Sequence, residues 1–166
     1  MARLRALVTG APVALAFCAA TAAADVIDLP NTRATVTIDA AWTPVTAPGL
    51  VAAYRTADGL VAAITRAQIP NPDAWREKKR DAYTSEVERG VLGADLKRTA
   101  RKVALLDGVP TLELEARRPD GATVLVRILL FRTYALSLAI EVPRGAPAAA
   151  ARAVLGSFAP PPAAKP

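Results

Sequence analysis

Alternating apolar and polar residues in the second half of the chain predict three successive β-strands. Residues 111–117 place apolar side chains on one face and Thr or Glu on the other. Residues 123–131 and 134–142 continue the pattern, and 123–131 is apolar on both faces except at Arg127. A strand that is apolar on both faces is usually covered on both faces. We therefore predict a central antiparallel sheet with a helix or a partner on each side.

The first of these hairpins also suggests a register. Placing Glu115 opposite Arg127 would bring Leu112 against Leu130 and make an opposite-charge pair on the other face. The second apolar face of 123–131 is expected to lie under the last helix or against a second copy of the chain, as a homodimer.

Weaker patterns complete an order of three strands, a helix, four strands and a helix. The further strands are expected over 33–39, 50–56, 60–69 and 96–106. The last helix is expected over 148–155, with Phe158 packed inward. This order predicts an α+β fold, an α/β/α sandwich whose central antiparallel sheet has about six to seven strands, in a single domain over 25–158.

The helix between the two sets of strands is predicted to begin at Asn71 and Pro72, to run to about Arg89, and to end at Gly90 or Gly93. Its apolar face is predicted to contain Trp75, Ala82 and Tyr83, with Val87 near the edge. Its charged face is predicted to contain Arg76, Glu77, Lys78, Arg80, Asp81 and Glu88. Such a helix is expected to lie on a sheet.

Residues 1–24 are predicted to be a secretory signal peptide. Arg3 and Arg5 precede an apolar run over 6–18, and Ala22-Ala23-Ala24 offers a cleavage site before Asp25. The alternative is lipidation at Cys18, although Phe17 departs from the usual lipobox. We expect a periplasmic or secreted protein with no transmembrane segment in the mature chain and a disordered Pro/Ala tail over 159–166.

Composition removes several classes of chemistry. The chain has no His, and its one Cys lies in the predicted signal peptide, so the usual general base, thiol catalysis and common zinc ligands are missing. The net charge is +6 overall and +4 without the two arginines of the predicted signal peptide, which is mildly basic and does not predict nucleic-acid binding. We expect no catalytic residues, no cofactor and no metal, and we classify the protein as a non-enzyme.

Several motifs resemble the PsbP-like fold, shared by the photosystem II extrinsic protein and the DcrB-like exported proteins of bacteria. The matching segments are 106–110 followed by Leu112-x-Leu114, the strand 126–131, 134–138 with Val142-Pro143, and Ser157-Phe158. The resemblance covers most of 32–158. It implies an α/β/α sandwich and an exported, non-enzymatic role, and it carries over no catalytic residues.

The sequence thus favours a binding or assembly factor of the cell envelope that recognises a protein partner through its surface. The expected contacts are Arg76, Lys79, Arg80 and Trp75. A second basic set contains Arg98, Arg101, Lys102, Arg117 and Arg118, and the fold decides whether it joins the first in space.

Two alternatives belong to other functional classes. One is a carrier whose ligand pocket lies between the sheet and the helix of Trp75. The other is a hydrolase using Glu113 and Glu115, which share a strand face roughly 7 Å apart. The plainer interpretation of this pair is a strand face matched by arginine.

Overall fold

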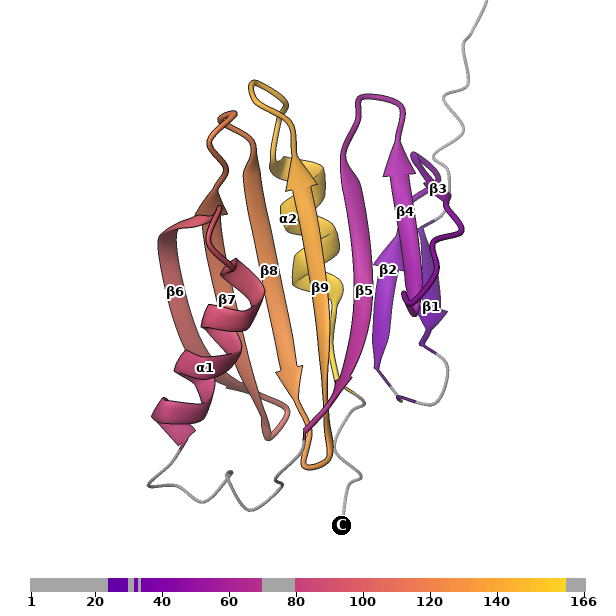
Figure 1. Ribbon diagram of the computed structural model, residues 1–166. Helices are drawn as coiled ribbons and strands as arrows, with labels where there is room; N and C mark the ends of the chain where they lie inside the picture. Colours follow the sequence, from indigo (N-terminus) through magenta and orange to yellow (C-terminus); the bar gives the residue numbers. More distant parts are fainter. Residues whose placement is uncertain (1–23, 30–31, 33, 70–79, 161–166) are drawn as a thin grey trace, which may run out of the picture.

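Two antiparallel sheets and two helices make up the computed structural model, which describes residues 24–29, 32, 34–69 and 80–160. The main sheet has seven strands in the order β3-β4-β5-β9-β8-β7-β6, and a second sheet pairs β1 with β2 (Figure 1). The elements are β1 Asp25–Asp28, β2 Thr35–Ile38, β3 Trp42–Pro44, β4 Ala52–Thr56, β5 Val61–Gln68, α1 Arg80–Leu92, β6 Lys97–Leu106, β7 Val109–Arg117, β8 Thr123–Leu130, β9 Tyr134–Val142 and α2 Ala149–Ser157.

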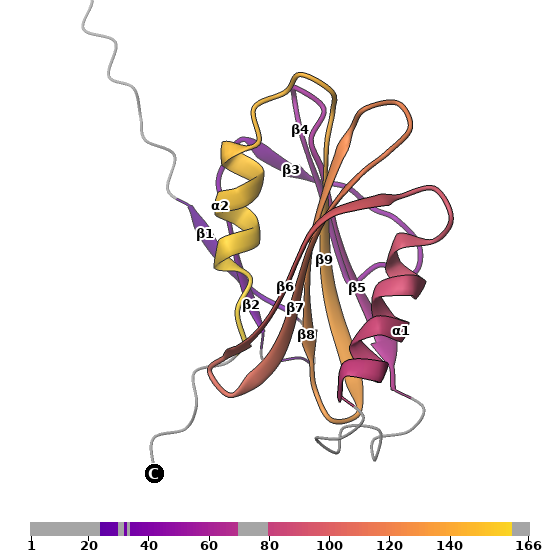
Figure 2. The ribbon, with the colours of Figure 1, turned by 90° about the vertical axis from the view of Figure 1, so that its left-hand side faces the viewer.

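The main sheet is covered on both faces, which confirms the predicted α+β sandwich. Helix α1 lies on one face, and α2 with the β1–β2 sheet lies on the other (Figure 2). Leu125 and Leu129 of β8 share a buried cluster with Ala151 and Val154 of α2. The second apolar face of β8 therefore lies under the last helix. The last helix was one of the two covers predicted for this face, and a second copy of the chain was the other. Phe158 is fully buried in the same cluster, as predicted.

Two short strands were not predicted. Residues 25–28 were expected to be a lead-in and form β1, while Trp42, expected after the end of a strand, begins β3. Ala159, which the sequence placed in the tail, forms a β-bridge with Thr35 of β2. Residues 25–28 and 42–44 show no alternation of apolar and polar side chains that would predict a strand.

The predicted β7–β8 register is wrong by two residues. Glu113, not Glu115, lies opposite Arg127, and Leu112 lies opposite Ile128. A shift of two residues leaves every side chain on its original face, because side chains alternate with period two. The apolar pattern therefore fitted both registers equally well.

A β-bulge interrupts the outermost strand, β6. Arg98 pairs with Ala116 and Ala100 pairs with Glu115, so Thr99 is the extra residue. In a regular strand Arg98 and Arg101, three residues apart, would point to opposite faces. The bulge brings both to the face that carries α1, since their partners Ala116 and Leu114 point that way.

Helix α1 ends where Gly93, at φ +56°, donates its N–H to the carbonyl of Arg89. Of the predicted apolar face, Tyr83 and Val87 pack on the sheet, but Ala82 is exposed. Glu88, expected on the charged outer face, is buried. The predicted helix start at Asn71 and Pro72 lies outside the described residues.

Candidate functional site

The contacts expected from sequence fall largely outside the structure's described residues. Trp75, Arg76 and Lys79 lie within 70–79, and Arg80 begins α1 but its side chain is not described. By helix rise, Arg80 and Leu92 stand roughly 18 Å apart at opposite ends of α1. The second basic set is described in full. Four of its members form ion pairs: Arg98, Arg101, Lys102 and Arg118. Arg117 forms none with a described residue.

Arg98 and Arg101 converge on the carboxylate of Glu88 beneath α1. Arg101 Nε lies 2.8 Å from Glu88 Oε2, Arg98 donates to the other carboxylate oxygen, and Arg101 also donates to Thr84 Oγ1 at 3.3 Å. Burial by itself raises the pKa of Glu88, but the hydrogen bonds and positive charge of the two arginines outweigh it and lower the pKa below its ordinary value. This cluster ties α1 to the sheet edge.

Glu113 and Glu115 border a cavity of about 230 Å³ beside α2. Each carboxylate is already bound: Glu113 lies 2.8 Å from Arg127 Nη2, and Glu115 lies 2.8 Å from Arg152 Nη2. Lys102 approaches Glu113 at 3.9 Å. Both carboxylates are engaged in ion pairs with arginine, so this geometry does not favour the hydrolase alternative.

Arg127 has a second role at the same place. Its Nη1 donates to the carbonyl oxygens of Gly156 and Phe158 at 2.9 and 3.0 Å. These carbonyls belong to the negative end of α2, where a cation is favourable. Arg127 thus fastens the end of the helix to the sheet.

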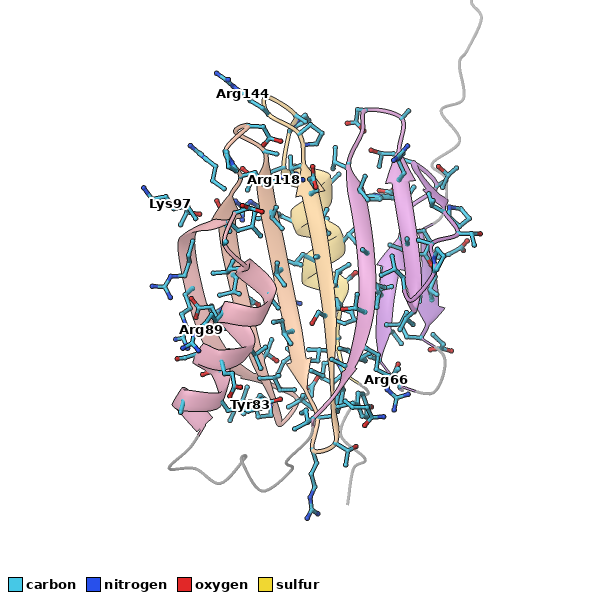
Figure 3. The ribbon with its side chains drawn as sticks, viewed as in Figure 1. Arg66, Tyr83, Arg89, Lys97, Arg118 and Arg144 are labelled. Carbon is cyan, nitrogen blue, oxygen red and sulfur yellow. The ribbon has the colours of Figure 1, made fainter. Side chains whose placement is uncertain are left out.

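A free positive surface remains at the end of the sheet where β6 begins. Lys97 lies directly opposite Arg117 in the β6–β7 ladder, a pair of like charges. Arg144 in the loop after β9 lies at the same end, whereas Arg89 of α1 lies lower, beside the middle part of the sheet (Figure 3). We call Arg89, Lys97, Arg117 and Arg144 the basic rim.

Local backbone geometry positions Arg144. Its Cδ stands 3.0 Å from the place that a Cβ on Gly121 would occupy, and Gly121 has φ +90°. The glycine lets the β7–β8 loop turn and lets the arginine lie against it. Arg118 in that loop is different, because it binds Glu141 at 2.8 Å and approaches Asp120 at 3.7 Å.

Within the described part of the chain, no rim residue forms an ion pair. Acidic residues are interspersed, with Asp95 exposed between α1 and β6 and with the two partners of Arg118. Sequence reasoning found Arg117 but missed Arg89, Lys97 and Arg144. Counting back from the Asp107-Gly108 turn without the bulge places Arg98, not Lys97, opposite Arg117.

No described helix is long and apolar enough to cross a membrane. Residues 24–29, 32, 34–69 and 80–160 also contain no group of three or more acidic, His or Cys side chains placed to hold a metal ion.

Comparison with known proteins identifies the fold. No protein-family model matches the chain, and no curated protein matches it. The solution structure of cyanobacterial PsbP (CyanoP) from Synechocystis sp. PCC 6803 is similar, with a TM-score of 0.53 and 13% sequence identity. The match covers 81% of this chain and 86% of that one. The chain therefore has a PsbP-like fold.

Proposed function

We propose that this chain of PsbP-like fold is an exported, non-catalytic protein that binds an acidic protein partner of the cell envelope through the basic rim. The carrying observation is the opposition of Lys97 and Arg117. Like charges directly opposite each other destabilise a strand pair. Carboxylates of a partner placed between them would relieve this repulsion.

The composition of the rim favours a protein over a polyanion. Its cations are few, and exposed acidic residues such as Asp95 lie among them. Nucleic acids and anionic membranes select denser positive charge. A protein surface with mixed charges can match this arrangement.

The proposal also includes export of the protein and a relationship to a known group of exported proteins. Cleavage before Asp25 would release a chain whose first residue starts strand β1. The alternative is a lipoprotein anchored through Cys18, and the intact mass of the purified protein separates the two. We also propose kinship with the DcrB-like exported proteins, which the motifs around Asp107 and Ser157 first suggested.

The earlier set of Arg76, Lys79, Arg80 and Trp75 remains a second proposed surface. The start of α1, where Arg80 lies, is the helix end away from Arg89 and the rim. A partner interface of ordinary size could cover either the basic rim or this second surface. Reversing the charges of each surface in a separate variant distinguishes the two.

Crosslinking and affinity purification from the native envelope test the proposal. The variant carries Lys97→Glu with Arg117→Glu, and the control carries Arg55→Glu with Arg132→Glu, both exposed and without described ion pairs. We expect one dominant partner, lost with the rim variant and kept with the control. Equal recovery with both, or no partner for folded and abundant protein, contradicts the proposal. Loss only on reversing Arg76, Lys79 and Arg80 moves the site to the earlier surface.

A single substitution gives a sharper signature. Lys97→Glu alone turns the like-charge pair into an opposite-charge pair with Arg117. It should raise the free energy of unfolding by about 0.2–1 kcal/mol while weakening partner binding. A variant that gains stability and loses binding cannot owe the loss to misfolding. Unchanged binding in the stabilised variant would reject the rim as the contact.

A further inference from the structure

The two outer edges of the main sheet differ in length and in protection (Figure 1). Strand β3, at one edge, has three residues and ends at Pro44, and short edge strands with proline resist further pairing. Strand β6, at the other edge, has ten residues, and its backbone pairs only with β7 among the described residues. The bulge at Thr99 interrupts the first part of β6, so residues 101–106 form a regular, open edge. Such an edge is a template for a further strand.

The turn after β6 fixes which backbone groups face this edge. Asp107 has φ +49° and Gly108 has φ +80°, the conformation of a two-residue type I′ hairpin turn. The flanking residues Leu106 and Val109 therefore exchange backbone hydrogen bonds, and every second residue before Leu106 also bonds to β7. The residues between them, whose N–H and C=O groups point away from the sheet, are Arg101, Val103 and Leu105.

Two exposed side chains at this edge are apolar. Val103 is 40% exposed and Leu105 is 64% exposed. Both lie on the sheet face that carries α1, since Val103 pairs with Leu112 of the cluster beneath that helix. Asp107, in the adjoining turn, is exposed and forms no ion pair with a described residue. The edge thus offers backbone groups, apolar side chains and a carboxylate to a covering strand.

We infer that β6 pairs antiparallel with β6 of a second copy of the chain, about a two-fold axis at Ala104. In this register Val103 of each copy lies opposite Leu105 of the other, and the outward-pointing backbone groups meet one another. Arg101 of each copy lies opposite Asp107 of the other. The contact therefore covers apolar side chains with apolar side chains and places opposite charges together.

Side-chain chemistry selects this register among those that the backbone allows. The outward-pointing groups of two copies meet only when the two-fold axis passes through a residue, because these groups alternate. An axis at Arg101 or Lys102 would place a cation against its own copy. An axis at Val103 would place Leu105 against Arg101. An axis at Leu105 would place Val103 against Asp107. Only the inferred axis covers both exposed apolar side chains with each other.

This dimer contact is independent of the proposed function. The rim residues Lys97 and Arg117 lie beyond the bulge, outside the paired stretch 101–107. The face of β8, for which a second copy was first predicted as a cover, lies under α2 instead. A contact between two strands is smaller than a standard interface, so we expect a weak dimer, with a Kd of about 10 µM to 1 mM.

Sedimentation equilibrium of the exported protein measures this dimer. Val103→Lys should weaken dimerisation at least about tenfold, because it places an ammonium group against Leu105 of the other copy. Val103→Lys with Leu105→Glu should restore it, because each lysine then faces a glutamate. Val45→Lys is the control, at a side chain 43% exposed outside β6, and should dimerise normally.

Two results of this measurement would overturn the inference. One is a protein that stays monomeric at about 1 mM, which would leave the edge to a strand of another protein. The other is a dimer that Val103→Lys does not weaken.

Cysteine crosslinking tests the register itself. In a Cys18→Ser background an introduced cysteine is the only one in the chain. Two copies of Ala104→Cys would meet at the two-fold axis with Cα atoms about 4.5 Å apart, within the range of a disulfide. Lys102→Cys is the control, because its two copies would stand roughly 13 Å apart along the strands. We expect disulfide-linked dimers from Ala104→Cys alone. Equal yields from both variants, or none from Ala104→Cys, reject the inferred pairing.

Discussion

Glu88 shows that the tertiary surroundings of a charged residue decide whether it meets solvent or forms a buried ion pair. The sequence places it on a charged helix face, where it was expected to meet solvent. In the fold it is 8% exposed and is bound by Arg98 and Arg101. Helical periodicity alone could not find this contact, because the two arginines reach the same side only through a bulge in another element.

Glu88→Gln should destabilise the protein in a pH-dependent way. The pKa of Glu88 is lowered in the folded state, so its stabilising contribution is present above the ordinary glutamate pKa of about 4.3 and is lost as pH falls through the folded value. We expect a loss of about 1–2 kcal/mol at pH 7, discounted because both arginines are partly exposed, and a much smaller difference near pH 3.

Urea denaturation at the two pH values measures this difference. Glu86→Gln is the matched control, since Glu86 lies on the same helix and is exposed, and it should change stability by less than about 0.5 kcal/mol. A loss that is equal at both pH values would mean that the carboxylate charge of Glu88 is not responsible.

Arg127→Leu should cost more than removal of an exposed arginine. The variant leaves Glu113 without its close partner and removes donors from the carbonyls of Gly156 and Phe158. We expect about 2–3 kcal/mol lower free energy of unfolding. Arg132→Leu, at an exposed turn, is the control and should be near neutral. Equal stability of the two variants in urea would contradict the fastening role.

Among the elements, β6 contains the feature that was hardest to predict from the sequence, its β-bulge. The Asp107-Gly108 turn and the alternation of β7 predict a regular hairpin, and one extra residue, Thr99, changes which side chains face α1. The β7–β8 register failed for a related reason, because a two-residue shift preserves the apolar pattern. The longer strands and the C-terminal end of α1 were predictable, whereas bulges and registers depend on loop geometry.

Deletion of Thr99 tests the account of the bulge. Removing the extra residue leaves Arg98 opposite Ala116 and Ala100 opposite Glu115, so Arg98 and Arg101 stay on the same face. We expect a change in stability of less than about 1 kcal/mol and an undiminished Glu88→Gln penalty in the deleted background. Deletion of Ala104 in the same strand is the control, because it should reverse the facing of Arg98 and abolish that penalty. A penalty abolished by the Thr99 deletion would show that another residue is the extra one.

For the whole molecule, the layered α+β fold was predictable because β8 is apolar on both faces. The small β1–β2 sheet was not, since it depends on contacts between the two ends of the described chain. Ser157 Oγ accepts the N–H of Thr37 at 2.9 Å, and Thr35 and Ala159 exchange hydrogen bonds at 3.1 Å. The candidate surface was only partly predictable, because it combines residues from α1, β6, β7 and a loop.

Phe158→Ala should destabilise α2 and strand β2 together, which cover the same face of the main sheet. Phe158 is fully buried in the cluster that contains Val36 of β2 and Val154 of α2. We expect a loss of about 3–5 kcal/mol and faster amide hydrogen exchange in both elements. Leu105→Ala, at a side chain 64% exposed, is the control. Faster exchange in α2 alone would contradict this coupling.

The contact between Thr37 and Ser157 also predicts the order in which the strands form during folding. The hairpins from β6 to β9 join neighbours in the sequence and can form early, whereas β2 must wait for residues 120 positions further along the chain. During synthesis, one of the first strands to emerge would be among the last to be protected. Pulse-labelled hydrogen exchange should therefore find the amides of Thr35 and Thr37, which donate to Ala159 and Ser157, protected after those of β8. A nascent chain in that interval would display the apolar side of β2 to whatever chaperone accompanies it.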